Sequence, residues 1–389
     1  MRRLLVLGAA AAAACSAVLL LAASATGQQT QTIYIGMDAP LTGPTAVVGQ
    51  GDREAVNALV NFWNRGRAFK NRRIQVDILD NASSPSQAVQ NVQRFVADPK
   101  YVAILGSGNA GAAIATAPLA TAGQVPFLPL SPPTALVVPP RPYVYVALPT
   151  GRLYAYSMAQ YLKRQNIQRI ALMGDNGGFG RDGVAQVKAL ARAYGFTITD
   201  EFIFSPTSTS FAAELARVRN SNAQALWMWT VTPAGNTIVK EFRQLQLPQR
   251  LVLTGGNLSS QFLEATCPDV NGALVNSFLG VVSEQLPRGN PIRARAQIVQ
   301  RATGKPLSVF HVDASTSMFA LKAAMERGGF TRQGINTALE TKIRGLATPG
   351  GRLFFGPRNH SGIQMDSMWA GRIVQCKPRA LFGKAFEKR

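Results

Sequence analysis

The chain has 389 residues, a formal net charge of +21 and 47% hydrophobic residues, and this length favours two domains with ordinary apolar cores. The positive charge alone would suit a nucleic acid, an anionic surface or acidic ligands. Because no basic run is longer than Asn71-Arg72-Arg73 and no nucleic-acid-binding motif occurs, we expect a generally basic surface and no nucleic-acid partner.

The N-terminus has the pattern of an export signal. A basic start precedes an alanine-rich apolar stretch, Leu4–Ala23, and Ala23-Ser24-Ala25 has the small-x-small form of a signal peptidase site. The sequence therefore predicts a signal peptide over residues 1–25 and a mature chain that starts near Thr26. A retained membrane anchor is disfavoured because no second apolar span follows. The residues before Cys15 fit a lipoprotein signal poorly.

Strands and helices alternate through the first third of the mature chain. Short apolar or alternating runs indicate strands, whereas apolar residues three or four apart indicate helices. Ser84 with Pro85 has the residue types of a helix N-cap and first turn. The expected elements are a strand at Thr32–Ile35, a helix from about Gly51, a strand over Ile74–Ile78, a helix from Ser84, a strand at Tyr101–Leu105 and a helix ending near Ala122. Such alternation implies a parallel sheet with helices on both faces.

The strongest functional signal is the glycine-rich turn Gly106–Gly111, which separates the strand Tyr101–Leu105 from the next helix. Backbone N–H groups at a helix N-terminus have no acceptor within the helix and favour carboxylates or phosphates. A second apolar run begins at Val125 and ends in the polar segment Leu130–Thr134. Because ligands of open α/β sheets bind at the carboxyl ends of the strands, the sequence predicts a ligand site there.

The same turn matches the dinucleotide-binding pattern G-x-G-x-x-G. That site also needs an acidic residue after the next strand, which holds a ribose. No Asp or Glu occurs between Asp98 and Asp175, so the sequence argues against a dinucleotide, and we expect no cofactor. A tight turn without any ligand is the other alternative.

A second strand–helix series begins after Pro149-Thr150-Gly151, where we expect the chain to enter another domain. Expected strands are Arg169–Met173, Thr197–Phe204, Ala225–Trp229 and Leu251–Thr254, and expected helices are Leu153–Gln165, one ending at Tyr194, Phe211–Asn220 and Gly235–Leu245. Later strands are expected at Gly272–Phe278, Gly351–Phe355 and Ser367–Val374, and later helices at about Pro291–Thr303, Val312–Arg327 and Thr331–Lys342. The two halves thus have the pattern of two similar α/β lobes.

The chain has three cysteines, of which Cys15 would leave with the signal peptide. Cys267 and Cys376 would then stand in an oxidising compartment, where disulfides form. The sequence does not give their separation in space, so a disulfide and two free thiols both stay open. CxxC pairs and Cys/His metal spacings are absent, and no metal site is expected.

Three short motifs, in their order and spacing, carry a family resemblance: Ile35-Gly36 with Pro40–Pro44, Asp80 with Pro85 and Ala88, and Asp175-Asn176 with Phe179-Gly180. Over nearly the whole mature chain, the sequence resembles the periplasmic binding proteins of the branched-chain amino-acid family, the ligand receptors of ABC importers. The resemblance implies an α/β fold of two doubly wound parallel-sheet lobes, joined by three crossings, with a ligand cleft that closes by a hinge motion. It implies lobe one over 26–148 and about 280–354, and lobe two over 149–279 and about 355–389.

The resemblance also implies where a ligand binds. In this family an amino-acid head group is held in lobe one by the glycine-rich turn, here Asn109 and Ala110, and by the lip of the next strand, here Pro132 and Thr134. The turn residue is Asn109 where the family has serine, although an amide can still donate to a carboxylate. Phe179 falls at the position of an aromatic wall in lobe two.

The main departure from the family pattern concerns the residue that would pair with a ligand's ammonium group. Amino-acid-binding members have an acidic residue after a lobe-two strand, and that place here is Gly255-Gly256-Asn257. A buried ammonium without a polar partner is costly, so we expect a small carboxylate-bearing ligand with an apolar or aromatic body. Asp38, after the first strand, is a candidate replacement, which keeps a hydrophobic or branched-chain amino acid as the second candidate. Trp229 would either stack on an aromatic ligand or lie in the core.

An enzyme is not expected. The two histidines, His311 and His360, lie next to no G-x-S-x-G or H-E-x-x-H pattern, and no nucleophile–base pair of a cleft hydrolase can be located. The ligand-sensing module of a signalling receptor is a further alternative, disfavoured because no downstream membrane span follows. The family resemblance implies a periplasmic monomer whose partners are its small-molecule ligand and the membrane permease of an ABC importer.

Overall fold

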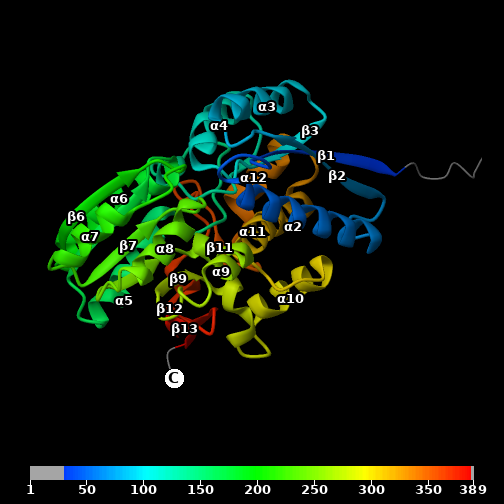
Figure 1. Cartoon of the computed structure of the whole chain (residues 1–389). Coiled ribbons are helices and arrows are strands. Elements are labelled where there is room, and N and C mark those ends of the chain that lie inside the picture. The colour runs from blue at the N-terminus through cyan, green and yellow to red at the C-terminus, as the bar shows by residue number, and fades with distance from the viewer. Residues whose placement is uncertain (1–29, 387–389) are drawn as a thin grey trace, which may run out of the picture.

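The computed structural model describes residues 30–386, which fold around two β-sheets (Figure 1). The predicted signal peptide over residues 1–25, with Cys15, lies outside the described residues. The first sheet is parallel throughout, in the order β2-β1-β3-β4. Its strands are β1 (Gln31–Ala39), β2 (Arg72–Asp80), β3 (Tyr101–Leu105) and β4 (Phe127–Leu128), connected by α2 (Ala46–Arg65), α3 (Pro85–Ala97) and α4 (Ala110–Ala122).

Helices cover both faces of the first sheet, and its central strands β1 and β3 are mostly buried between them. α3 and α4 lie together over one face, and α2 lies over the other (Figure 1). Ser84 caps α3 as predicted: its hydroxyl accepts from the backbone N–H of Gln87 at 3.4 Å, and Pro85 stands in the first turn. On β1, the alternate residues Ile35 and Met37 are fully buried under α2 and its neighbours.

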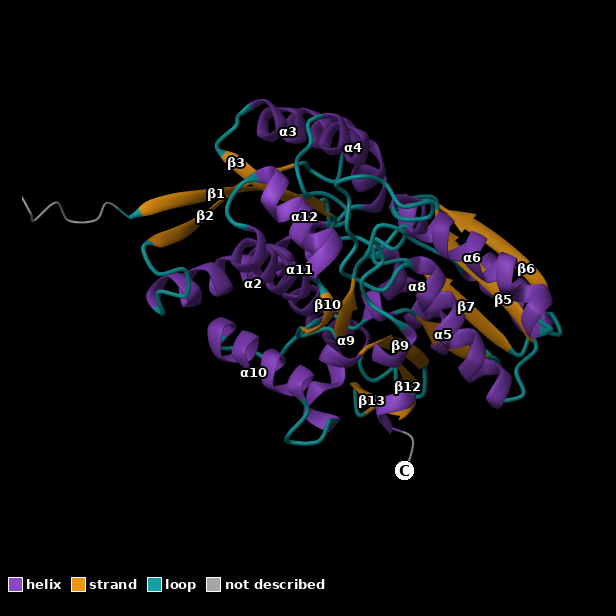
Figure 2. Cartoon of the chain, turned by 180° about the vertical axis from the view of Figure 1, so that it is seen from behind, coloured by secondary structure: helices purple, strands orange, loops and turns teal. Residues whose placement is uncertain are grey.

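The second sheet has seven strands, in the order β13-β12-β9-β8-β7-β5-β6. Five of them run parallel: β5 (Arg169–Asp175), β6 (Thr197–Phe204), β7 (Ala225–Trp229), β8 (Arg250–Leu253) and β9 (Leu274–Phe278). The helices that precede or connect these strands are α5 (Gly151–Arg164), α6 (Gly178–Tyr194), α7 (Ala212–Asn220), α8 (Ala234–Gln244) and α9 (Ser260–Thr266). Together with these helices, the seven-stranded sheet forms a second layered α/β unit (Figure 2).

One edge of the second sheet departs from the predicted parallel arrangement. β12 (Met368–Val374) runs antiparallel to β9, and β13 (Lys377–Phe382) runs antiparallel to β12. The turn between β12 and β13 consists of Gln375 and Cys376, with φ of 50° and 58°, and a two-residue turn with positive φ joins antiparallel neighbours. Because neither residue is glycine or asparagine, residue preference does not mark this turn, and β13 is absent from the predicted elements.

Between β9 and β12 the chain returns to the first sheet. α10 (Pro291–Thr303) and α11 (Val309–Gly328) pack against α2, and α12 (Arg332–Lys342) packs against α11 (Figure 2). β10 (Arg344–Ala347) and β11 (Arg352–Phe354) then pair as a small antiparallel sheet. Short 3-10 helices occur at Thr134–Leu136, Gly255–Asn257, Leu279–Gln285, Met365–Ser367 and Lys384–Phe386.

The division of the chain into two lobes remains a proposal. One isolated β-bridge joins Val146 to Ser361, and another joins Leu353 to Ile363. The chain up to Ile363 therefore lies beside the segment that follows β4 of the first sheet. β12 of the second sheet begins only at Met368. We would therefore place the third crossing after Ile363 rather than near Phe355.

Two glycines explain why α2 begins earlier than predicted. The sequence predicts a helix from about Gly51, whereas α2 begins at Ala46. A Cβ on Gly49 would lie 2.3 Å from the carbonyl oxygen of Pro40, and a Cβ on Gly51 would lie 2.9 Å from the Cβ of Phe310. Both glycines stand inside the helix because other backbone and side-chain atoms approach it closely there, and neither marks its start.

A disulfide joins Cys267, which follows α9, to Cys376 in the β12–β13 turn. Their Cα atoms are 5.7 Å apart, and the sequence separation is 109 residues. The bond thus links the C-terminal hairpin to a helix that precedes β9. Within residues 30–386, no helix has both the length and the apolar character needed to cross a lipid bilayer.

Candidate functional site

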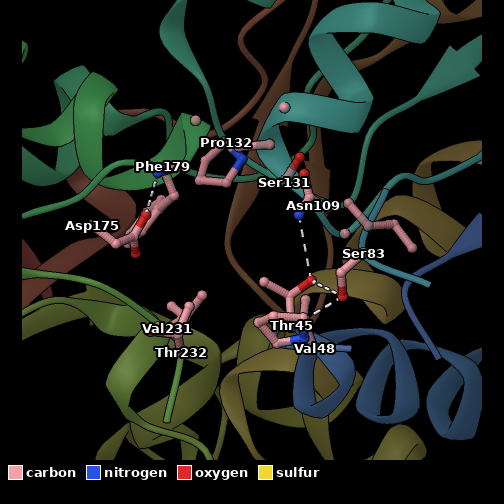
Figure 3. A pocket seen from close by; sticks show the side chains of 18 of the residues that line it. Thr45, Val48, Ser83, Asn109, Ser131, Pro132, Asp175, Phe179, Val231 and Thr232 are labelled. Carbon is pink, nitrogen blue, oxygen red and sulfur yellow. Dashed lines mark hydrogen bonds between the residues drawn. The ribbon is translucent and has the colours of Figure 1, made fainter. Parts of the chain in front are cut away.

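A cavity of about 390 Å³ lies where the carboxyl ends of the parallel strands of both sheets meet (Figure 3). This volume suits a small molecule. The side from the first sheet includes Thr45, Ser83, Asn109, Ala110 and Pro132, the side from the second sheet includes Asp175, Phe179, Val231 and Thr232, and Tyr154 of α5 and Asp313 of α11 complete the wall.

A chain of polar side chains forms one side of the cavity (Figure 3). The amide Nδ2 of Asn109 donates to Thr45 Oγ1 at 3.4 Å, and Thr45 Oγ1 donates to Ser83 Oγ at 2.9 Å. Ser83 Oγ in turn donates to the carbonyl oxygen of Thr42 at 2.8 Å. These bonds fix the loops that follow β1, β2 and β3 relative to one another before any ligand binds.

The first turn of α4 also faces the cavity. Asn109 is the N-cap of α4, and its Oδ1 accepts from the backbone N–H of Ala112 at 3.0 Å. The amide of Asn109 is therefore already engaged at both ends. The backbone N–H groups of Ala110 and Gly111 belong to the same first turn, where the helix itself provides no acceptor. They are the groups best placed to bind a carboxylate.

The opposite side of the cavity is mostly apolar. Phe179, in the first turn of α6, lies against Trp229 with ring centroids 5.6 Å apart. Val231, on the loop after β7, lines the same side of the cavity (Figure 3). Asp175, at the end of β5, is one of the polar residues on this side, together with Thr232: it accepts from the backbone N–H of Gly177 at 2.9 Å, and burial raises the pKa of its carboxyl group.

Of the predicted site residues, Asn109, Ala110, Pro132 and Phe179 lie on the cavity wall, and Thr134 does not. Thr134 begins a 3-10 helix. Its backbone N–H and its Oγ1 both donate to the carboxylate of Asp182 on α6 at 3.1 Å, and Oγ1 accepts from the backbone N–H of Arg152. Its hydroxyl therefore joins two parts of the protein and is not offered to the cavity.

Asp38 and Trp229 also lie behind the wall. Asp38 is fully buried, and its carboxylate accepts from Asn81 at 2.7 Å and from Asn91 at 2.9 Å. Burial raises its pKa, although these bonds oppose the shift. Asn81 also donates to Ser107 Oγ at 2.7 Å, so Asp38 is connected through Asn81 to the glycine-rich turn. Trp229 is fully buried as well, behind Phe179.

Two acidic residues at the base of the cavity are absent from the predicted site. Asp313 of α11 lines the cavity, and Asp52 of α2 lies buried behind it, with no hydrogen-bond partner for either carboxyl oxygen among residues 30–386. Burial raises the pKa of both carboxyl groups well above the usual range, and repulsion from Asp313 raises that of Asp52 further. A signal for Asp52 exists in the sequence, because it stands three residues before Ala55 on the buried face of the helix.

Asparagine at either of these positions is expected to stabilise the protein at about pH 8, because an amide has no proton to lose there, and each unit by which a pKa is raised corresponds to about 1.4 kcal/mol. The folded-state pKa of Asp52 and of Asp313 is raised, so the wild-type protein loses stability as the pH rises from about 4 toward that raised pKa. The variants lack this loss. Urea unfolding of Asp52→Asn and Asp313→Asn at low and high pH measures the difference.

The gain in stability of each asparagine variant over the wild type should be larger at the higher pH. Glu264→Gln changes an exposed acid on α9 and is the control, for which we expect no gain. Equal stability of wild type and variants at about pH 8 would contradict a buried, repelled carboxyl pair. Among residues 30–386, no group of three or more His, Cys, Asp or Glu side chains could hold a metal ion.

Comparison with known proteins gives matches over most of the chain. A family model described as periplasmic binding protein matches residues 32–377. The Leu/Ile/Val-binding protein BraC3 of Rhizobium johnstonii is 24% identical over 351 residues, which cover 88% of this chain and 93% of that protein.

Solved structures share the fold. An extracellular ligand-binding receptor from Rhodopseudomonas palustris HaA2 has a TM-score of 0.83 at 20% identity, with 90% of this chain and 99% of that chain covered. A solute-binding protein of an ABC transporter from R. palustris, in complex with benzoate, has a TM-score of 0.79 at 16% identity, with 91% and 96% covered. At these identities the likeness concerns the fold, and it confirms the predicted α/β fold class.

Proposed function

This chain belongs to the periplasmic binding protein family, and we propose that it captures a small carboxylate-bearing molecule in the cavity and delivers it to the membrane permease of an ABC importer. The family consists of substrate-binding proteins and not of enzymes. The ligand that we propose is an apolar or aromatic acid, or a hydrophobic or branched-chain amino acid. We further propose that the protein acts as a monomer in the periplasm.

One observation carries this proposal: the first turn of α4 faces an apolar wall across the cavity. The free N–H groups of a helix N-terminus favour an anion, and Phe179 with Val231 offers apolar surface to the rest of the ligand. The relatives support the same class. One is named for leucine, isoleucine and valine, and another was solved with benzoate, and each of these molecules combines a carboxylate with an apolar body.

A thermal-shift screen tests the proposed ligand class. Aliphatic acids, aromatic acids and amino acids are compared with their amides, which keep the body and lose the negative charge. A ligand at about a hundred times its Kd should stabilise the folded protein by roughly 2.7 kcal/mol. Stabilisation by amides and not by carboxylates would contradict the proposal, and calorimetry on the best compound then measures its affinity.

Ligand binding should depend on the close approach of α4 and α6, which Gly178 permits. A Cβ on Gly178 would lie 2.7 Å from the backbone nitrogen of Gly111 and 3.0 Å from the Cβ of Ala110. Gly178→Ala is therefore expected to wedge the two helices apart and to weaken binding by about 1–3 kcal/mol, roughly five- to 150-fold. Calorimetry with the best carboxylate of the screen measures this loss.

The control for this prediction is Gly289→Ala. Gly289 is exposed, and a Cβ there would meet nothing within 4 Å, so its affinity should match that of the wild type. Small-angle scattering gives a second readout, because ligand should contract the wild-type protein more than the Gly178→Ala protein. An unchanged affinity in Gly178→Ala would mean that binding does not need this contact.

A further inference from the structure

Two carboxyl groups at the base of the cavity have no polar partner in the described part of the chain. Asp313 is 8% exposed and lines the cavity, and its carboxyl group has no hydrogen-bond or ion-pair partner among residues 30–386. Asp52 is 0% exposed, and both of its oxygens lack a hydrogen bond. Buried polar groups in proteins are nearly always satisfied, so such a pair on a cavity wall needs an explanation.

Asp52 reaches the cavity wall at the glycine-rich turn. A Cβ on Gly108, which lines the cavity, would lie 2.8 Å from Oδ2 of Asp52. Asp313 lines the cavity itself and repels Asp52. α2 and α11 pack along each other, and a Cβ on Gly51 would lie 2.9 Å from the Cβ of Phe310, so Asp52 lies beside the segment of α11 that carries Asp313.

A nearby acidic residue on α2 differs from Asp52 and Asp313 because it has basic partners. Glu54, on α2, makes ion pairs with Lys305 at 2.6 Å and with His311 at 3.3 Å. These basic groups lie on or beside the start of α11, yet none of them reaches Asp52 or Asp313. The chain carries 41 Lys and Arg residues against 20 Asp and Glu residues, so a lack of basic side chains does not account for the unpaired carboxyls. Glu54 is thus paired with basic groups, whereas the carboxyl groups of Asp52 and Asp313 have no such partner among residues 30–386.

We infer that Asp313, with Asp52 buried behind it, forms a cation-accepting subsite in which the Asp313 carboxyl group binds a protonated amine of the ligand. The inference rests on the proposed function, and it adds to the ligand class an ammonium group together with the carboxylate. An ammonium group next to Asp313 would favour the ionised form of its carboxyl group and would donate hydrogen bonds to a group that has no other donor. The subsite lies on α11 and α2, away from Gly255-Gly256-Asn257, the place that the family resemblance implies for an ammonium partner.

Matched ligands test this inference by calorimetry. Hexanoate is compared with 2-aminohexanoate and 6-aminohexanoate, and 4-methylbenzoate with 4-(aminomethyl)benzoate, so that each series changes only the amine. For the wild-type protein we expect at least one amine-bearing compound to bind tenfold or more tightly than its amine-free parent. In Asp313→Asn this preference should disappear, and in Asp52→Asn it should weaken, with the affinity of each variant for the amine-free parent measured alongside.

Glu54→Gln is the matched control, because it removes an acid from the same helix that already has cationic partners, and its amine preference should equal that of the wild type. Equal affinity for amine-free and amine-bearing compounds in the wild type, or a preference that survives in Asp313→Asn, would overturn the inference and leave the proposed function intact. Stabilisation by calcium or magnesium chloride alone, lost in Asp313→Asn, would also overturn it in favour of a metal site. If none of the carboxylates binds, the proposed function itself fails.

Discussion

Replacing Trp229 by alanine is expected to lower the free energy of unfolding by about 3–5 kcal/mol, as for other large-to-small changes of buried aromatic side chains. Trp229 is fully buried at the end of β7, and its ring centroid lies 5.7 Å from that of Trp227 and 5.6 Å from that of Phe179. A Cβ on Gly183 would lie 1.9 Å from the indole, so this ring occupies the space that a glycine in α6 leaves free. Removing the ring therefore leaves a cavity.

Urea unfolding of Trp229→Ala measures the loss, and Trp229→Phe is the control that keeps an aromatic ring and should lose less. Phe179 rests against Trp229, so ligand affinity should fall too, as a second and smaller effect. If Trp229 stacked on the ligand instead, alanine would weaken binding and leave the stability near that of the wild type, which would contradict the placement described above.

Removing the disulfide is expected to lower the free energy of unfolding by about 2–4 kcal/mol. Cys267 and Cys376 are 109 positions apart in sequence, so the bond constrains a long stretch of the unfolded chain, which includes the whole return to the first sheet. The double variant Cys267→Ala/Cys376→Ala, compared with the wild type by urea unfolding, measures the loss.

A reducing agent provides the internal control for this prediction. Dithiothreitol should destabilise the wild-type protein to about the level of the double variant and should leave the double variant unchanged. If the oxidised protein and the double variant unfold at the same urea concentration, the cross-link contributes nothing to stability.

Elements with a strong local pattern were predictable to the residue. Tyr101–Leu105, Thr197–Phe204 and Ala225–Trp229 are strands with the expected bounds, and Pro291–Thr303 is a helix with the expected bounds, because apolar runs and an Asn-Pro start identify them locally. The start of α2 and the strand β13 were not predictable in this way. Glycines in α2 serve a close approach to distant atoms, and the turn before β13 contains none of the usual turn residues.

The residues of the candidate site also divide into those that the local sequence predicts and those that it does not. Asn109, Ala110, Pro132 and Phe179 reach the cavity because they directly follow strands whose carboxyl ends a parallel sheet brings together. Asp38 belongs to a strand itself, and its side chain points into the buried layer beneath the glycine-rich turn. The proximity of Asp52 and Asp313 depends on α11 packing along α2, a long-range contact that no local pattern predicts.

The antiparallel hairpin at the edge of the second sheet has a consequence for the newly made chain. Synthesis proceeds from the N-terminus, so β9 pairs with β8 while its other edge waits for β12. All five residues of β9 are buried in the finished protein, and an unpaired apolar strand edge is a template for aggregation. Each residue on the cavity wall precedes Met368. A polypeptide that terminates before Met368 would thus carry every described residue that lines the cavity and still be expected to accumulate as insoluble aggregates.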